Sequence, residues 1–460
     1  MKKIKIFLVL LVSATVVAFA QEEDNVKYDQ YGMEVKSKPL KTEMRDGILV
    51  FESKEAGYKI WFDARIQADF ATFFGEDDDY DKIGSGASIR RARFAVKAQI
   101  SPNWYGEIDL DFSNGIAELK DAIVRYDGIK NVEIQIGNFK EAFSMQRNTS
   151  SRYLQLMERP MVTYLAPSRH LGAQIKYNNP LIWAAGGVFF QEIAGDEEIT
   201  NVQDNNKDFG RSTGVSYTGK FVVRPLYKSK EAGIHLGGAV SYRTPKSHDA
   251  PGDWGGVRHS TRNSTSINRK KYLDTDVIKG VDHELRYTAE LAANYQGLRF
   301  ETAYIGTNVV LKDNSPEVNK SDKNFGGWYA QAGYLLFGGK QRYDYSGAKY
   351  NRVQRGKKWG DVEVVGRYEY LNLNDFDAGV YGGSAQAYTL GLNFWVNNNV
   401  KIMLNYQYNN NDRFANGKNK LFVGHDASGN PTKDYTKVVE GKGKAGVDYS
   451  MLSMRFEIVF

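Results

Sequence analysis

The chain has 460 residues, a formal net charge of +6 and no cysteine, and 13% of its residues are aromatic. The absence of cysteine excludes a small exported protein that is held together by disulfides. Three lysines and no acidic residue lie among the first twenty residues, so the rest of the chain carries only +3. That balance is too weak to indicate a nucleic-acid partner.

Residues 1–20, MKKIKIFLVLLVSATVVAFA, have the pattern of a secretory signal peptide, in which lysines precede an apolar run that ends in small residues. We expect removal after Ala20, which leaves a chain that begins at Gln21. No later run of about 18 apolar residues predicts a membrane-spanning helix. Residues 21–57 are polar and have no strong pattern apart from ILVF at 48–51.

In the rest of the chain, apolar residues recur at every second position, which is the period of a β-strand with one apolar face. Residues 86–101 are an example, because Phe94 and Val96 alternate there with Arg93 and Lys97. We count sixteen such segments, at 58–73, 86–101, 103–113, 117–127, 131–138, 169–178, 181–192, 211–224, 231–243, 282–296, 297–309, 325–338, 360–372, 384–397, 398–411 and 446–460.

The last segment alternates up to the final residue, Phe460. A terminal strand that ends in an aromatic residue resembles the signal by which bacterial outer-membrane barrels are recognised for insertion. Together with the predicted signal peptide, it favours a transmembrane barrel over a water-soluble sandwich. In such a barrel the apolar faces meet lipid and the charged faces line a watery lumen.

The links between the segments alternate in length. Links after even-numbered segments are mostly short, whereas long links follow odd-numbered segments at 139–168, 193–210, 244–281 and 412–445. Short periplasmic turns and long outer loops are typical of outer-membrane barrels. The exception is the link at 339–359, which is long although it falls on the periplasmic side.

These patterns predict an all-β protein, a 16-stranded antiparallel transmembrane β-barrel over residues 58–460. Residues 21–57 are then an N-terminal periplasmic segment, because an even number of strands leaves both ends in the periplasm. A barrel of this size leaves an aqueous channel. We therefore expect a protein of the bacterial cell outer membrane, surrounded by lipid and lipopolysaccharide, that passes solutes.

Several stretches, taken together and in their order, resemble the phosphate-selective porin O and P family over nearly all of the predicted mature chain. They are ARIQAD at 64–69, IRRARFAV at 89–96, EIDLDF at 107–112, LKDAIVRY at 119–126, IQIGNFKEAFS at 134–144, MERP at 157–160, RHLGAQI at 169–175, LFGGKQRY at 336–343 and DVEVVGRYEYL at 361–371.

The resemblance implies a homotrimeric diffusion channel without a cofactor, whose third outer loop, here 139–168, folds inward as a constriction. It also implies that arginines and lysines of the wall and of that loop draw small anions through, phosphate or polyphosphate among them. By alternation, Arg90 points away from the lumen. The candidates for the anion pathway are Arg65, Arg91, Arg93, Lys97, Arg159 and Arg169.

The pairing of neighbouring strands bears on three of these candidates. If the turn between them is tight, Lys97 faces Glu107 and Arg93 faces Asp111. Cross-strand pairs of opposite charge stabilise a sheet by roughly 0.2–1 kcal/mol each, so these two cations are either neutralised in place or available to solutes. Arg91 has no acidic neighbour in this register, which makes it the stronger candidate, and its planar fork suits a phosphate.

Three other functions are alternatives to an anion channel. The six histidines are scattered and lie in no nucleophile or metal-ligand motif, which argues against an enzyme. A general or carbohydrate-selective porin without anion specificity is the main alternative. A sugar channel would show an aromatic track in the lumen, and the aromatic residues with inward parity are Trp61, Tyr329 and Trp395. A structural barrel or adhesin that acts through its loops also stays open.

Overall fold

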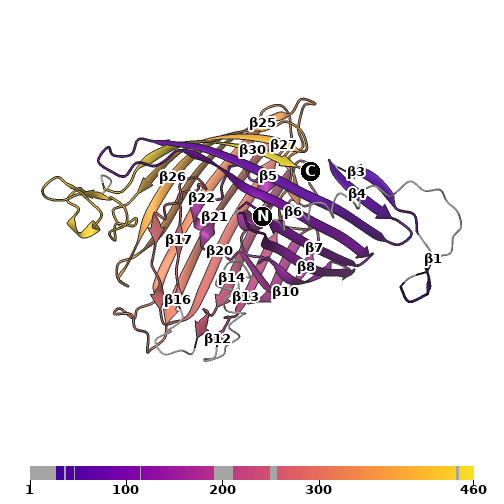
Figure 1. Cartoon of the computed structure of the whole chain (residues 1–460), viewed down its shortest axis with the longest axis horizontal. Helices are drawn as coiled ribbons and strands as arrows, with labels where there is room; N and C mark the ends of the chain where they lie inside the picture. Colours follow the sequence, from indigo (N-terminus) through magenta and orange to yellow (C-terminus); the bar gives the residue numbers. More distant parts are fainter. Residues whose placement is uncertain are drawn as a thin grey trace, which may run out of the picture.

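The computed structural model describes residues 27–460 except 29, 36–37, 46, 114, 191–210, 249–255 and 442–444. The predicted signal peptide at 1–20 and the link at 193–210 lie outside the described residues. Sixteen antiparallel strands, each hydrogen-bonded to its neighbours, close into a barrel (Figure 1). Among the described residues, no helix is long and apolar enough to cross a membrane.

All sixteen predicted segments form strands of this wall, with ends that differ by a few residues. The strands are β5 Tyr58–Phe74, β6 Gly86–Ser101, β7 Trp104–Asp111, β8 Glu118–Ile129, β9 Val132–Lys140, β10 Arg169–Asn178, β11 Ile182–Phe189, β13 Ser216–Val223, β14 Ala232–Arg243, β20 Val281–Tyr295, β21 Leu298–Leu311, β22 Lys323–Leu335, β25 Asp361–Asp375, β26 Val380–Trp395, β27 Val400–Asn411 and β30 Tyr449–Val459.

The seam of the barrel joins the last strand, β30, to the first, β5, with pairs that run from Ser450 opposite Phe74 to Val459 opposite Arg65. The terminal residue extends this ladder, because the backbone N–H of Phe460 donates to the carbonyl of Ala64 at 3.1 Å. Closure leaves none of the sixteen strands at an edge of the sheet, and that is the condition for a sheet in lipid.

The alternation seen in the sequence separates the two faces of the wall. On β6, Ile89, Phe94 and Ile100 are exposed on the outside, whereas Arg91 is 4% exposed inside. A transmembrane barrel needs this arrangement, since a Lys or Arg on the lipid face at mid-depth costs roughly 2–4 kcal/mol.

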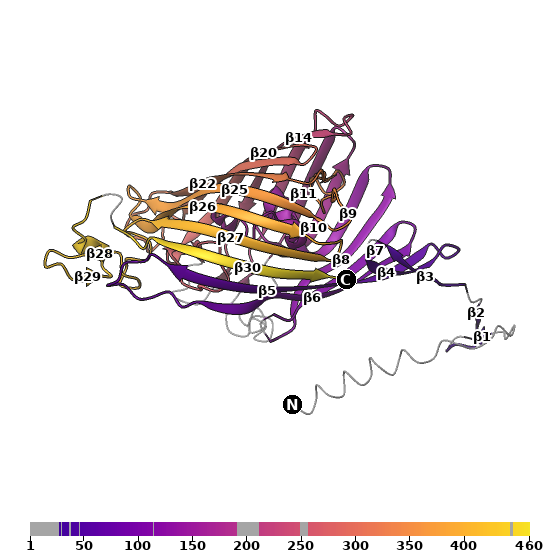
Figure 2. The ribbon, with the colours of Figure 1, turned by 90° about the horizontal axis from the view of Figure 1, so that it is seen from above.

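The N-terminal segment contributes a hairpin of β3, Lys41–Arg45, and β4, Ile48–Ser53, which the sequence pattern marked only through ILVF. Strand β4 pairs with the start of β5, from Tyr58 to Trp61, and so continues the wall beyond the point where β30 ends. The hairpin lies at the opposite end of the barrel from β28–β29 in the loop at 412–445 (Figure 2).

The loops and the N-terminal segment also contain short helical turns and two-residue strands. Before β3, β1 Lys27–Tyr28 pairs with β2 Glu34–Val35. The helical turns are α2 Met145–Asn148, η1 Ser151–Tyr153, η2 Met161–Tyr164 and η3 Tyr435–Lys437; the two-residue loop strands are β12 Arg211–Ser212, β15 Ser247–His248, β16 Gly256–Val257, β17 Ser260–Thr261, β18 Leu273–Asp274, β19 Ile278–Lys279, β23 Tyr343–Asp344, β24 Lys349–Tyr350, β28 Gly424–His425 and β29 Pro431–Thr432.

Candidate functional site

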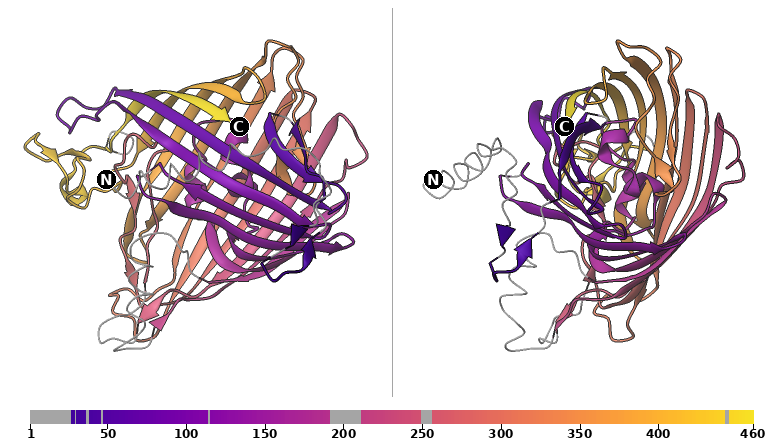
Figure 3. Two further views of the ribbon diagram at one scale, coloured as in Figure 1. Left: turned by 45° about the vertical axis from the view of Figure 1, so that its right-hand side comes forward. Right: turned by 90° about the vertical axis from the view of Figure 1, so that its right-hand side faces the viewer.

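The inward-folded loop at 139–168 fills one side of the lumen, where its turns α2, η1 and η2 lie inside the ring of strands (Figure 3). Carboxylates of the wall hold its backbone: the N–H of Met145 donates to Glu290 at 2.8 Å, and the N–H of Met161 donates to Glu369 at 2.5 Å. These charge-assisted bonds fix the loop. The same bonds occupy the carboxylates of Glu290 on β20 and Glu369 on β25.

Two further segments fold into the lumen, which the sequence did not predict. In the loop at 244–281, the hydroxyl of Ser264 donates to the carbonyl of Arg159 at 3.3 Å. At the other end, the indole N–H of Trp183 donates to the carbonyl of Ser346 at 2.9 Å, within the link at 339–359. This link is therefore long because it turns back into the barrel rather than extending away from it.

A cavity of about 870 Å³ lies beside strands β5–β10. Its described lining contains fifteen Arg and Lys residues against seven Asp and Glu, an excess of eight positive charges. The cations are Arg65, Arg90, Arg91, Arg93, Lys97, Lys120, Lys140, Arg147, Arg152, Arg159, Arg169, Lys176, Arg262, Arg269 and Lys349; the acids are Asp63, Glu107, Asp109, Asp111, Glu118, Asp121 and Glu158.

The predicted register between β6 and β7 is confirmed, because Arg93 lies opposite Asp111 and Lys97 opposite Glu107. Arg93 Nε donates to Asp111 at 2.8 Å. Lys97 Nζ lies 2.9 Å from Asp63 and 3.3 Å from Glu107. Both cations line the cavity while they are held in ion pairs.

Arg169 also lines the cavity and is paired, since its guanidinium makes two hydrogen bonds to Asp121, at 3.0 and 2.8 Å. Lys140, at the end of the neighbouring strand β9, is different. In the described part of the chain no carboxylate lies within ion-pair distance of it, and its Nζ is 3.5 Å from the carbonyl of Thr149. The alternation pattern of the sequence alone did not distinguish Lys140 from the cations that are held in ion pairs.

Arg65 and Arg159 are predicted pathway residues that form no ion pair with a carboxylate in the described part of the chain. Arg65 donates to the hydroxyl of Ser151 at 2.6 Å, and Arg159 donates to two backbone carbonyls of its own loop, both at 2.6 Å. Burial, and after it the charge of Arg147, lowers the pKa of Arg159 to about 9. Arg159 is therefore still cationic at neutral pH.

Two expectations for β6 are wrong. The pairing with β5 shifts at Arg90, because Gln67 faces Arg91 while the next residue of β5 faces Ile89. This β-bulge turns Arg90 inward, where it bonds to Glu158 at 2.6 Å, instead of away from the lumen. Arg91 does have an acidic neighbour, since its Nη2 lies 4.0 Å from Glu158 and its Nη1 donates to Gln67 at 2.7 Å.

The three aromatic residues with inward parity do not form a track along the cavity, and none of them is in its described lining. Tyr329 and Trp395 are buried, with 1% and 5% of their surface exposed, and the indole N–H of Trp395 donates to Glu363. Trp61 packs on Tyr105.

A closed barrel of sixteen strands, with lipid-facing apolar residues and a polar cavity narrowed by an inward loop, defines an outer-membrane porin. The model of the family described as phosphate-selective porin O and P matches residues 60–427, and the chain belongs to this family. It is thus a channel of the bacterial outer membrane and not an enzyme.

Two relatives are similar in sequence to most of the chain, and one solved structure shares its fold. Porin O of Pseudomonas aeruginosa is 25% identical over 409 residues, which are 79% of this chain and 85% of that protein. An uncharacterized protein of Caulobacter vibrioides is 26% identical over 350 residues, 74% of this chain and 66% of its own length. The outer membrane protein OmpT of Vibrio cholerae, in its trimer form, has the same fold with a TM-score of 0.50 at 10% identity, covering 87% of this chain and 99% of its own.

Proposed function

We propose that this porin is a diffusion channel for small anions, with inorganic phosphate among its solutes. The observation that carries the proposal is the excess of eight positive charges in the described lining of the cavity. A cavity lined by one sign of charge, with walls of low dielectric constant, raises the local concentration of ions of the opposite sign. Membership of the phosphate-selective porin O and P family supports phosphate as a solute.

The test is the reversal potential of the purified channel in a planar bilayer with a roughly tenfold KCl gradient, followed by titration with phosphate. An anion channel gives a reversal potential near that of chloride, and bound phosphate reduces the chloride current. A reversal potential near zero would instead favour a general porin. Block of the current by an oligosaccharide, without block by phosphate, would favour a carbohydrate channel.

We further propose that the channel is a homotrimer and that export removes residues 1–20. Three copies are supported by the fold shared with OmpT in its trimer form. Residues 21–57, which include the hairpin β3–β4, would then lie in the periplasm. Light scattering of the detergent-solubilised protein measures the copy number, and sequencing of the N-terminus of protein from outer membranes tests the cleavage site.

A further inference from the structure

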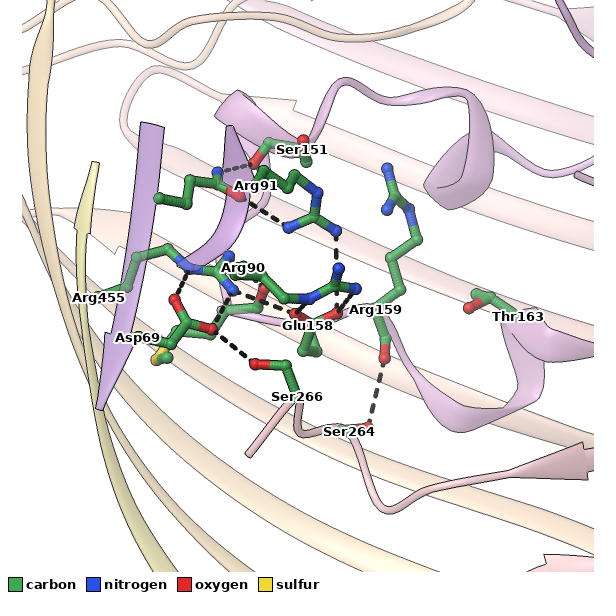
Figure 4. Close-up of polar contacts among 12 residues, drawn as sticks. Asp69, Arg90, Arg91, Ser151, Glu158, Arg159, Thr163, Ser264, Ser266 and Arg455 are labelled. Atoms are coloured by element: carbon green, nitrogen blue, oxygen red, sulfur yellow. Dashed lines mark hydrogen bonds and ion pairs between the residues drawn. The ribbon is translucent and has the colours of Figure 1, made fainter. Parts of the chain in front are cut away.

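Glu158 is the only acidic residue of the loop at 139–168 in the described lining of the cavity, and it lies among arginines (Figure 4). Its carboxylate accepts two hydrogen bonds from Arg90, at 2.6 and 3.1 Å, and one from Arg455 at 3.1 Å. Arg91 lies 4.0 Å away. Three guanidinium groups from β6 and β30 thus converge on one carboxylate.

The three arginines depend on Glu158 to different degrees. Arg455 also makes two bonds to Asp69, at 2.6 and 2.7 Å, and Arg91 also donates to Gln67. Both hydrogen bonds that the structure shows for the Arg90 side chain go to Glu158. Arg90 lines the cavity and keeps 30% of its side-chain surface exposed. If the charge of Glu158 were removed, Arg90 would become the most available of these three guanidinium groups.

We propose that Glu158 is a specificity-determining residue of the channel. Its carboxylate binds the guanidinium group of Arg90 and competes with permeating oxyanions for that group. A carboxylate and a phosphate use the same two-pronged contact with a guanidinium, so one excludes the other. The β-bulge that turns Arg90 inward builds this contact into the wall. The inference rests on the proposed function, in that anions must enter the cavity.

A purely structural role for Glu158 would be to fasten the loop to the wall. The loop has other fastenings that a neutral side chain at position 158 leaves intact. The N–H of Met161 donates to Glu369, and Arg367 donates to the backbone carbonyl of Glu158 at 2.8 Å. Arg455 keeps its two bonds to Asp69. We therefore expect the Glu158→Gln channel to fold and insert.

The experiment measures the block of single-channel chloride current by inorganic phosphate at fixed ionic strength. Glu158→Gln should tighten the block about tenfold, because a charge-assisted hydrogen bond to a freed guanidinium is gained. Glu118→Gln is the matched control, since Glu118 lines the same cavity and is paired with Lys120. It removes the same charge but frees no arginine of the cluster, so the block should change by less than about threefold.

Two further variants separate charge from packing. Glu158→Asp keeps the anion with a shorter side chain and should keep the block of the original protein. Adding Arg90→Gln to Glu158→Gln should abolish the gain. The proposal is overturned if Glu158→Gln inserts with an unchanged or weaker block, if Glu158→Asp matches Glu158→Gln, or if Glu118→Gln gives an equal gain.

If Glu158→Gln does not insert, the single variant Arg90→Gln decides. The guanidinium of Arg90 is already occupied by Glu158 in the original protein, so Arg90→Gln should weaken the phosphate block only through the lost charge, by about fivefold or less. A larger loss would overturn the proposal. A failure of the proposed function would appear elsewhere, as a reversal potential near zero in the unmodified channel. Glu158→Gln would still move that potential toward chloride.

Discussion

Lys140 and Lys97 give a matched pair for testing whether an ion pair withdraws a lysine from solute binding. Both line the cavity from strands of the same side of the barrel. Lys97 Nζ lies 2.9 and 3.3 Å from two carboxylates, whereas Lys140 has none within ion-pair distance among the described residues. Replacing either lysine with glutamine removes one positive charge and little volume.

The two variants should differ in phosphate binding. Loss of a direct hydrogen bond between a charged group and phosphate costs about 1.5–3 kcal/mol, so Lys140→Gln should weaken the block about 10- to 100-fold. Lys97 already donates to carboxylates, so Lys97→Gln loses only the attraction through space. That attraction is about 1 kcal/mol or less between unit charges a few ångströms apart in water, which is roughly fivefold or less.

The reversal potential should not separate the two variants. Each removes one positive charge from the same cavity, and the potential far from a charge does not depend on which neighbours it had. The assay is therefore a phosphate titration of chloride current at constant ionic strength, since salt screens both effects. An equal loss of block in the two variants, or a larger loss in Lys97→Gln, would refute the pairing argument.

Deleting Phe460 should lower the folded fraction in outer membranes, because its backbone N–H and carbonyl both bond to β5 at the seam; heat-modifiable mobility on gels measures this, and a normal yield would contradict it. Replacing Arg455 with Met leaves the buried carboxylate of Asp69 without its ion-pair partner. The free energy of unfolding in a urea titration should therefore fall by ~3–5 kcal/mol. A loss under about 1 kcal/mol, as at an exposed pair, would refute this. A cysteine at Ser428 should react with an impermeant maleimide in intact cells and one at Lys130 only after permeabilisation, and equal labelling would contradict the predicted sidedness.

The wall could be predicted from the sequence because its determinants are local. Lipid rejects charge from one face of each strand, so the alternation had to be regular, and all sixteen strands were found. The register of two neighbouring strands could also be predicted where the turn between them is short. A short turn fixes which residues lie opposite each other, and Arg93 lies opposite Asp111 as predicted. The N-terminal hairpin was missed except for ILVF, because β3 is polar and fully exposed and carries no alternating signal.

The errors at Arg90 and Arg91 have two physical causes. Alternation assumes one residue on each strand per step, and the β-bulge at Arg90 breaks that count without leaving a mark in the sequence. The partner of both arginines, Glu158, is far along the chain and belongs to a loop, not to the neighbouring strand. Strand pairing predicts contacts between neighbouring strands only, so it could not predict a contact with a residue of the inward-folded loop.

Inward parity also cannot tell a channel-lining residue from one buried beneath a loop, and this distinction decides where the charge of the lumen acts. Glu290 and Glu369 have inward parity on the wall, yet they bond to the backbone of the loop at 139–168 and do not line the cavity. Packing the loop on this wall thus removes these carboxylates from the water path, together with cations such as Arg299 and Arg367 that pair with carboxylates there. The inward segments also bring charge of their own: Arg147, Arg152, Arg159, Arg262, Arg269 and Lys349 line the cavity against the single carboxylate of Glu158. The positive sign of the cavity therefore depends more on the segments that fold into the barrel than on the strands of the wall.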